Sequence, residues 1–358
     1  MEIKKIKQNT AIICLSSNSG GMEIDAIKLA QKLSNYTYIT LIAKENQFIA
    51  NSKEEYLNND IQLETINFKS NLGISIILNA KRIIKKYHIK NIIFFGASEL
   101  KSLYFSFLGL DINLIVRHGT TKSRPKKDWF HKLIYSNVNY HVSICKHLQH
   151  NVEYIIPFGE KTESKLIYSS FNFNPPQSQQ NKKLTILHIG RIAQGKGQID
   201  AIKACDILVQ NGIDFEFNIV GGFEKSYKDD FLTFYNLCSY RDKINLIGYT
   251  KDIEFYLNRA DIFLFPSHGE GLSNAFMEAL SYNLVTLSYN NTSFPELKDL
   301  GLYFKMIQHL DIDQLKNSLL YVTQNLLKEK EYSSRNSTLI KRLFSLEKEM
   351  SNYLKILE

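Results

Sequence analysis

The densest group of residues able to do chemistry is a glycine turn with two carboxylates. Glu270 stands between two glycines, and Glu278 follows within the apolar stretch 276–280. Glycine lets a backbone bend and approach a ligand closely, and the free N–H groups at a helix start attract anions. A solvated helix face is the alternative interpretation, but a carboxylate among apolar neighbours usually has a partner. The stretch therefore predicts a ligand site.

A second turn, about seventy residues upstream, carries two cations. Arg191 and Lys196 lie in a glycine-rich turn, directly after the apolar run Leu184–Ile189. The planar guanidinium of arginine grips phosphate, lysine adds a point charge, and glycine lets amide groups come close. A solvated loop is the alternative. Together, cations for a diphosphate and carboxylates for sugar hydroxyls indicate a nucleotide-sugar rather than a bare nucleotide.

Both turns follow short apolar runs, and such runs alternate with helical patterns along most of the chain. This alternation predicts doubly wound parallel sheets, in which ligands bind beyond the carboxyl ends of the strands. The strands expected in the first half are Ala11–Leu15, Tyr38–Ala43, Asn91–Phe95, Asn113–Val116 and Val152–Pro157. Those expected in the second half are Leu184–Ile189, Phe215–Val220, Ile244–Ile247, Asp261–Phe265 and Leu284–Ser288, with a helical tail from Ile312 onward.

Length and composition predict two domains. The chain has 358 residues, of which 44% are hydrophobic, enough for two cores. A polar segment with two prolines and no periodicity separates the two strand–helix series. We expect a first domain at 1–170, a linker at 171–183 and a second domain at 184–339. The final helix, 340–358, is expected to join the first domain.

Charge and cysteine usage indicate which classes of partner and which cellular compartment to expect. The net charge of +8 permits an anionic partner, but the chain has no recognition-helix pattern, zinc spacing or RNA-binding aromatic motif, so nucleic acid is not expected. The four cysteines have no metal-site spacing and no disulfide pattern, which predicts a reducing cytoplasm. No apolar run is long enough for a signal peptide core or a membrane span. The residues do not indicate an oligomeric state.

The most basic stretch lies in the first half and contains the only tryptophan. One interpretation is a solvated loop, and the other is a surface for anionic lipid headgroups on the inner face of the cytoplasmic membrane. The residues of this tentative membrane surface are Lys122, Arg124, Lys126, Lys127 and Trp129.

In the order and spacing of its motifs, the chain resembles the retaining family-four (group 1) glycosyltransferases of the GT-B fold. That fold has two Rossmann-like domains facing each other across a cleft. The motifs are Gly190-Arg191 with Lys196-Gly197, Glu270-Gly271-Leu272-Ser273-Asn274 with Glu278-Ala279, and, in support, Gly20-Gly21, His118-Gly119, Gly248-Tyr249 and Pro295-Glu296. Two departures concern donor identity. Gly221-Gly222 lacks a following acidic residue, and Asn291-Thr292-Ser293 replaces a glycine pair.

The resemblance implies a role for each matched position. Arg191 and Lys196 would neutralise the donor diphosphate, Glu270 would contact the donor sugar, and Glu278 would bind the ribose hydroxyls. His118 would contact the sugar from the first domain. The remaining implied residues are Gly190, Gly271, Leu272, Ser273, Asn274, Gly248 and Tyr249 in the donor site, and Gly20 and Gly21 on the acceptor side. No metal and no cofactor is expected.

The expected reaction is transfer of a hexose or N-acetylhexosamine from a nucleotide-diphosphate sugar to a bacterial surface glycan or glycolipid, such as lipopolysaccharide or lipooligosaccharide. A uridine-diphosphate donor is favoured over guanosine-diphosphate mannose. Two alternatives stay open: a nucleotide-sugar epimerase of the same build, and a non-catalytic sugar- or partner-binding subunit of a glycosylation complex. The paired glutamates argue against the epimerase, and the presence of both cations and both glutamates argues against the silent subunit.

Overall fold

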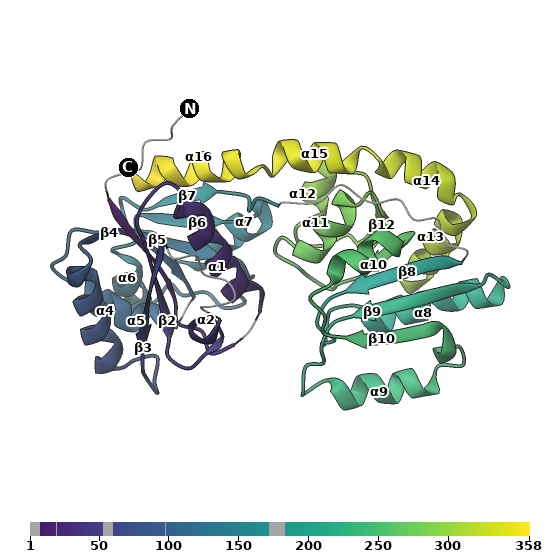
Figure 1. The fold of residues 1–358 in the computed structure, drawn as a ribbon, viewed down its shortest axis with the longest axis horizontal. Coiled ribbons are helices and arrows are strands. Elements are labelled where there is room, and N and C mark those ends of the chain that lie inside the picture. The colour runs from purple at the N-terminus through teal and green to yellow at the C-terminus, as the bar shows by residue number, and fades with distance from the viewer. Residues whose placement is uncertain (1–7, 19, 53–59, 97, 172–182) are drawn as a thin grey trace. The chain divides into compact units, whose positions relative to one another are not determined.

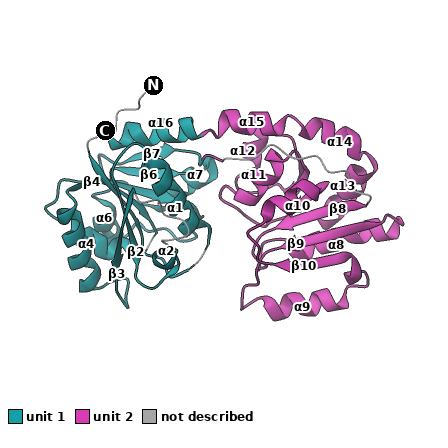
Figure 2. Cartoon of the chain, in the orientation of Figure 1, with its two compact units in different colours: residues 1–169, 346–358 teal, residues 170–345 magenta. Residues whose placement is uncertain are grey.

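The computed structural model describes all residues except 1–7, 19, 53–59, 97 and 172–182. The chain divides into two compact units, Met1–Ser169 with Leu346–Glu358, and Ser170–Ser345 (Figure 2). Most of the expected linker, 171–183, lies outside the described residues. The chain returns to unit 1 at residue 346, and the helix before that point, Asn336–Leu343, belongs to unit 2.

Unit 1 contains a seven-stranded parallel sheet in the order β3-β2-β1-β4-β5-β6-β7 (Figure 1). The strands are β1 Asn9–Cys14, β2 Ile39–Lys44, β3 Ile61–Ile66, β4 Ile89–Phe95, β5 Asn113–His118, β6 Tyr140–Ser143 and β7 Glu163–Leu166. The helices are α1 Gly21–Leu33, α2 Phe48–Asn51, α4 Ile74–Lys86, α5 Leu100–Phe107, α6 Trp129–Tyr135, α7 Lys146–Ile155 and α16 Leu346–Leu357. One hydrophobic core lies under α4 to α7, and another under α1, α2 and α16.

One expected strand of unit 1 is wrong. The residues Val152–Ile155 are the end of helix α7, and Ile156 is its C-cap. The strands that complete the sheet are β6 and β7. Leu148, Val152 and Ile155 recur at helical spacing and are all buried on one face of α7. A short apolar run fits a strand or a buried helix equally well, so the preceding residues decide.

Unit 2 contains a six-stranded parallel sheet in the order β10-β9-β8-β11-β12-β13. The strands are β8 Leu184–Ile189, β9 Phe215–Val220, β10 Ile244–Gly248, β11 Ile262–Phe265, β12 Val285–Tyr289 and β13 Lys305–Ile307. The helical elements are α8 Gln198–Gln210, α9 Lys228–Leu237, η1 Arg241–Lys243, α10 Ile253–Arg259, α11 Asn274–Ser281, α12 Phe294–Asp299, α13 Ile312–Gln324, α14 Leu326–Ser333 and α15 Asn336–Leu343. The helical tail from Ile312 is confirmed.

Each sheet has a point where the strand order reverses. In unit 1 it lies between β1 and β4, and in unit 2 between β8 and β11. Successive loops leave the sheet toward opposite faces there, which opens a crevice at the carboxyl edge. The predicted cation turn follows β8 and the predicted carboxylate turn follows β11, so unit 2 places both at its reversal point.

Candidate functional site

The turns after β8 and β11 contact each other at the carboxyl edge of unit 2. The Lys196 ammonium lies 2.8 and 3.0 Å from the two carboxylate oxygens of Glu270. His268 N–H donates to the Gly195 carbonyl at 2.8 Å, which joins the two turns through their backbones. The two predicted motifs, far apart in sequence, therefore form one site.

Glycine at position 197 makes this approach possible. Gly197 has a φ of +81° and precedes the first residue of α8. A Cβ atom there would lie 2.1 Å from the Pro266 carbonyl oxygen, well inside van der Waals contact. A side chain would therefore separate the two turns, besides straining the backbone.

The Glu270 carboxylate is held from several sides. Its side chain is 12% exposed, while that of Lys196 is 31% exposed. Ser267 Oγ donates to Glu270 Oε1 at 2.9 Å, and the backbone N–H of Glu270 donates to Thr292 Oγ1 at 3.0 Å. The carboxylate is thus fixed in position but remains reachable, as a group that accepts hydrogen bonds from a ligand must be.

The departure at Asn291-Thr292 has a structural role. Asn291 Nδ2 lies 2.9 Å from the Ser267 carbonyl, to which it donates, and 3.0 Å from His309 Nδ1. Thr292 Oγ1 donates to Asn291 Oδ1 at 3.0 Å, and its φ is +45°, in the region that glycine adopts most easily. Two side chains that a glycine pair would lack therefore brace the loop carrying Glu270.

Helix α11 presents its N-terminus directly after Glu270. Ser273 is the N-cap, and its Oγ accepts from the Phe276 N–H at 3.3 Å. Within the described part of the chain, no acceptor binds the backbone N–H groups of Gly271, Leu272 or Ser273. These donors and those of the first helical turn, beginning at Asn274, are oriented for an anion or sugar hydroxyls.

Glu278 lies in the second turn of α11. Phe276, Met277, Ala279 and Leu280 around it are fully buried, but Glu278 is only partly buried. Its charge is one of the causes that raise the pKa of Tyr282 to about 12, after burial and the neighbouring Glu254. Glu278 is thus an accessible carboxylate on an otherwise buried helix.

The remaining donor-side positions lie in the turns after β8, β9 and β10. Arg191 is exposed, and none of the described residues forms an ion pair with its guanidinium. A Cβ at Gly221 would lie 2.1 Å from the Gly190 carbonyl oxygen, so these turns also pack backbone to backbone. Gly221 N–H donates to the Gly248 carbonyl at 2.9 Å, and Tyr249 beside it is highly exposed.

Sequence reasoning missed a polar cluster behind the ion pair. His268 Nε2 lies 2.9 Å from Asp200 Oδ2, and the Tyr289 hydroxyl donates to the same oxygen at 3.1 Å. Burial and the Asp200 charge raise the pKa of Tyr289. These residues join α8, the turn after β11 and β12, so they fix the position of that turn. Asp200 in the first turn of a helix was the available signal, but it indicates only a favourable helix dipole.

Unit 1 holds the other predicted residues at its own reversal point or near it. Gly20 is the N-cap of α1 and Gly21 is its first residue, and α1 is the first helix after β1. His118 ends β5 but is packed, with 2% exposure. Its Nε2 lies 2.8 Å from Nδ1 of His141, and burial lowers its pKa well below the usual value. The role of His118 toward a donor sugar stays a prediction.

The basic run after β5 is partly tied to α7. Lys122 N–H donates to Asn151 Oδ1 at 2.8 Å, and Lys126 N–H donates to the Ile155 carbonyl at 2.9 Å. Burial, together with Lys126, lowers the pKa of Lys122 to about 8. Lys127 lies over the Tyr154 ring, whereas Arg124 and Trp129 are exposed. Not every cation of the run is therefore directed at solvent.

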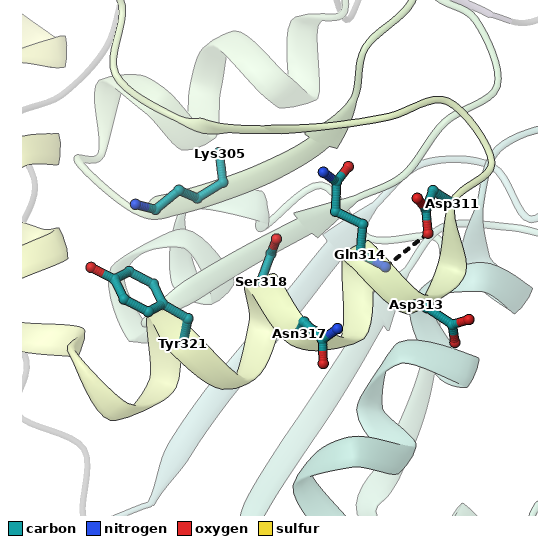
Figure 3. A pocket seen from close by; sticks show the side chains of 7 residues that line it. All are labelled: Lys305, Asp311, Asp313, Gln314, Asn317, Ser318 and Tyr321. Atoms are coloured by element: carbon teal, nitrogen blue, oxygen red, sulfur yellow. Dashed lines mark hydrogen bonds between the residues drawn. The ribbon is translucent and has the colours of Figure 1, made fainter.

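Other candidate features are few. Among the described residues, no group of three or more His, Cys, Asp or Glu side chains could hold a metal ion, and none of their helices is long and apolar enough to cross a bilayer. All four cysteines are free thiols, and three of them are buried. A cavity of about 620 Å³ lies along α13, and none of the predicted site residues lines it (Figure 3). It is lined by Lys305, Asp311, Asp313, Gln314, Asn317, Ser318 and Tyr321.

Comparison with known proteins finds a family match within unit 2. Residues 170–334 match the family described as "Glycosyl transferases group 1". This part of the chain is therefore similar to the group 1 glycosyltransferases, and the two Rossmann-like units have the GT-B fold. Solved structures with this fold include HepE of Anabaena in complex with UDP and glucose, with a TM-score of 0.82, 14% identity and coverage of 98% of this chain and 99% of that one. A glycosyltransferase from Rickettsia africae has a TM-score of 0.81 at 17% identity, with the same two coverages.

Several similar curated proteins are named for the synthesis of bacterial polysaccharides. The capsular polysaccharide biosynthesis glycosyltransferase CapH of Staphylococcus aureus is 26% identical over 176 residues, 49% of this chain and 48% of that protein. The amylovoran biosynthesis glycosyltransferase AmsK of Erwinia amylovora is 35% identical over 127 residues, 33% of this chain and 30% of that protein. The chain thus spans half or less of the length of these relatives.

Proposed function

We propose that the chain is a retaining glycosyltransferase. It transfers a hexose or N-acetylhexosamine from a nucleotide-diphosphate sugar, with UDP as the favoured nucleotide, to a glycan or glycolipid of a bacterial surface polysaccharide. The observation that carries the proposal is the Lys196–Glu270 pair at the reversal point of unit 2, next to the backbone donors of Gly271, Leu272 and Ser273. This arrangement offers a cation for a diphosphate and a carboxylate for a sugar, side by side.

The chemistry follows from where charge develops. Breaking the bond between the anomeric carbon and the phosphate oxygen leaves positive charge on the sugar and negative charge on the diphosphate. Arg191 and Lys196 stabilise the departing diphosphate without a metal ion, and the amides of α11 add fixed dipoles. The acceptor hydroxyl attacks from the face that the phosphate leaves, and its proton passes to a phosphate oxygen. The new bond therefore keeps the anomeric configuration.

The two carboxylates bind different parts of the donor. Glu270 sits against Lys196 and binds hydroxyls of the reacting sugar, while Glu278, a second accessible carboxylate along α11, binds the ribose hydroxyls. Gly190, Gly248 and Tyr249 border the nucleotide, and Asn274 begins the helix beneath the phosphates. In unit 1, Gly20 and Gly21 line the acceptor side, with His118 near the donor sugar.

The relatives support the acceptor class, and a solved neighbour supports the donor class. Similar curated proteins are named for capsular polysaccharide and amylovoran biosynthesis, and a structure of the same fold contains UDP and glucose. The four free thiols agree with a reducing compartment, so we place the reaction in the cytoplasm, where the acceptor can lie at the inner face of the membrane.

The test is a nucleotide-release assay with a panel of sugar donors, with and without candidate glycan acceptors, followed by product analysis. We expect UDP release that rises when an acceptor is present. Arg191→Ala and Lys196→Ala should each lower turnover by about 10²–10³-fold, as removal of a well-placed electrostatic donor does. Lys203→Ala, which removes an exposed cation of α8, the helix that follows this turn, is the matched control and should keep full turnover.

Other outcomes identify the alternatives. An epimerised donor formed without acceptor would indicate the epimerase, and donor binding without turnover would indicate a non-catalytic subunit. Folded Arg191 and Lys196 variants with unchanged rates would contradict the diphosphate site itself.

A further inference from the structure

Helix α4 of unit 1 has an exposed face with two chemically different halves. Ile74 is 73% exposed and Leu78, one turn later, is 62% exposed, and Leu72 just before the helix is also largely exposed. The opposite face of α4 packs into the core through Ile76, Ala80, Ile83 and Ile84. The apolar side chains at the helix start are thus not part of the fold's interior.

The second half of the same face is cationic. Arg82 and Lys85 continue the stripe of Ile74 and Leu78 at helical spacing, and both are exposed. Within the described chain, no acceptor takes a hydrogen bond from either side chain. Their neighbours are engaged: Lys86 pairs with Glu64 at 2.8 Å, and Lys81 donates to the Leu108 carbonyl at 3.1 Å.

The surroundings extend the same chemistry. Leu108, which Lys81 contacts, is itself exposed at the end of α5. No Asp or Glu occurs in the sequence between Glu64 and Glu99, so α4 itself carries only cations. An acidic neighbour on this side is Glu64, which pairs with Lys86 and lies near Arg82. Helices α4 and α5 pack side by side on one face of the sheet, which makes this a continuous patch (Figure 1).

We propose that this patch, formed by Leu72, Ile74, Leu78, Leu108, Arg82 and Lys85, docks unit 1 on an anionic lipid bilayer. The apolar side chains enter the boundary between headgroups and acyl chains, and the two cations contact lipid phosphates. A helix with an apolar and a basic exposed face binds membranes in this way. A protein partner is disfavoured because lysine is depleted in protein interfaces and because lipid phosphate requires no matching geometry.

The proposal goes beyond the glycosyltransferase function, since lipid binding requires neither donor nor acceptor. It also ranks two surfaces of unit 1. In the Lys122–Trp129 run, Lys122 and Lys126 are partly buried and their backbones are tied to α7, while Arg124, Lys127 and Trp129 are exposed. On α4 both cations are exposed, and they continue a stripe of exposed apolar side chains. We therefore assign the main lipid contact to α4.

The experiment is co-sedimentation of the full chain with two kinds of vesicle. One contains phosphatidylcholine alone, and in the other about 30% of the lipid is anionic phosphatidylglycerol. Wild type should bind the anionic vesicles and lose most of this binding at high salt. Arg82→Gln with Lys85→Gln should weaken the partition coefficient by about 25-fold, at roughly fivefold for each cation. Ile74→Ser with Leu78→Ser should weaken it at least as much.

Two controls keep the result specific. Lys225→Gln with Lys228→Gln makes the same charge change on exposed residues of unit 2 and should leave binding unchanged. Slow donor hydrolysis, measured on the same samples, should be equal in wild type and α4 variants, so a failure of lipid binding is separable from a failure of the catalytic proposal. Two outcomes would overturn the proposal. One is that the wild-type protein does not bind anionic vesicles at low salt. The other is that Lys127→Gln with Trp129→Ser abolishes binding while the α4 variants do not.

Discussion

The two units share one architecture but fill their carboxyl edges differently. Both have a parallel sheet with a reversal point beside the first strand. In unit 2 the turns at that point bring together Lys196 and Glu270, two charged and partly accessible side chains. In unit 1 the strand β5 ends in His118, which is buried against His141. The same fold thus carries a charged site in one unit and a neutral packed pair in the other, and the loops decide which.

Burial explains the difference in charge. A buried charge without a partner is costly, so a buried group stays neutral when it can. Burial and the nearby Lys122, Lys126 and Arg117 lower the pKa of His118. Burial and Lys122 lower the pKa of His141 to about 3. Lys196 and Glu270, in contrast, form an ion pair at 2.8 Å and are only partly buried. We therefore expect substitutions to act on turnover in unit 2 and mainly on packing in unit 1.

The largest effect should follow removal of the carboxylate at the reacting sugar. Glu270→Gln keeps the shape but loses the partner of Lys196, and turnover should fall by about 10²–10³-fold. Glu278→Gln should instead raise the KM for donor with a smaller change in kcat, since it removes binding shared by ground and transition states. Steady-state kinetics with the accepted donor give both quantities.

The histidine of unit 1 provides the contrast in the same assay. If His118→Gln lowers turnover as much as Glu270→Gln while the fold is intact, the site extends to His118 as the resemblance implies. If it lowers stability and leaves turnover within tenfold of wild type, packing is its main role. Equal kinetic effects of Glu270→Gln and Glu278→Gln would contradict the proposed division between them.

Local patterns predicted much of the unit 2 site, because its motifs are strand–turn–helix segments. Gly190, Arg191 and Lys196 could be placed at the end of a strand, and Ser273 at a helix cap, from neighbouring residues alone. The carboxyl-edge rule placed the turns of Lys196 and Glu270 at the same edge of the sheet, whereas the ion pair between the two side chains was not predicted. The resemblance supplied the family, which the comparison of residues 170–334 supports.

What could not be predicted depends on contacts distant in sequence. The bond from Glu270 N–H to Thr292 joins two loops, and local patterns describe each loop without its neighbour. The packing of His118 depends on His141 in the next strand, so its position at a strand end left both a buried and an exposed orientation open. The error at Val152–Pro157 has another cause, since an apolar run that short lacks a decisive period.

The second largest effect should be a difference in stability between alanine substitutions of two glycines, one after the first strand of each unit. Gly197→Ala places a Cβ 2.1 Å from the Pro266 carbonyl at a φ of +81°. Strain and overpacking together should lower the free energy of unfolding by about 2–4 kcal/mol. Gly21→Ala meets no atom within 4 Å and lies in a helix, so stability should be unchanged or higher by up to about 1 kcal/mol. Chemical denaturation of both variants measures the difference, and equal losses would contradict the close approach at Gly197.

The smallest predicted difference between the units is their loss of stability at acidic pH. His118 and His141 in unit 1, and His188 in unit 2, are buried with lowered pKa values, that of His188 at about 4 because of burial and the Lys196 charge. The unfolded chain, with a histidine pKa near 6.5, then binds protons that the folded chain does not. Their contribution to stability is therefore complete above about pH 6.5 and is lost as the pH falls toward the folded values.

At pH 5.5 each such histidine should cost about 1.4 kcal/mol of unfolding free energy relative to neutral pH, so unit 1 should lose roughly twice as much as unit 2. Hydrogen exchange of the most protected amides, corrected for the intrinsic effect of pH, reports each unit separately through β5–β6 and β8–β9. His150→Gln, which changes an exposed histidine of α7, is the control and should keep the wild-type pH response. A larger acid loss in unit 2 would mean that the buried histidine pair is not what distinguishes the two sheet edges.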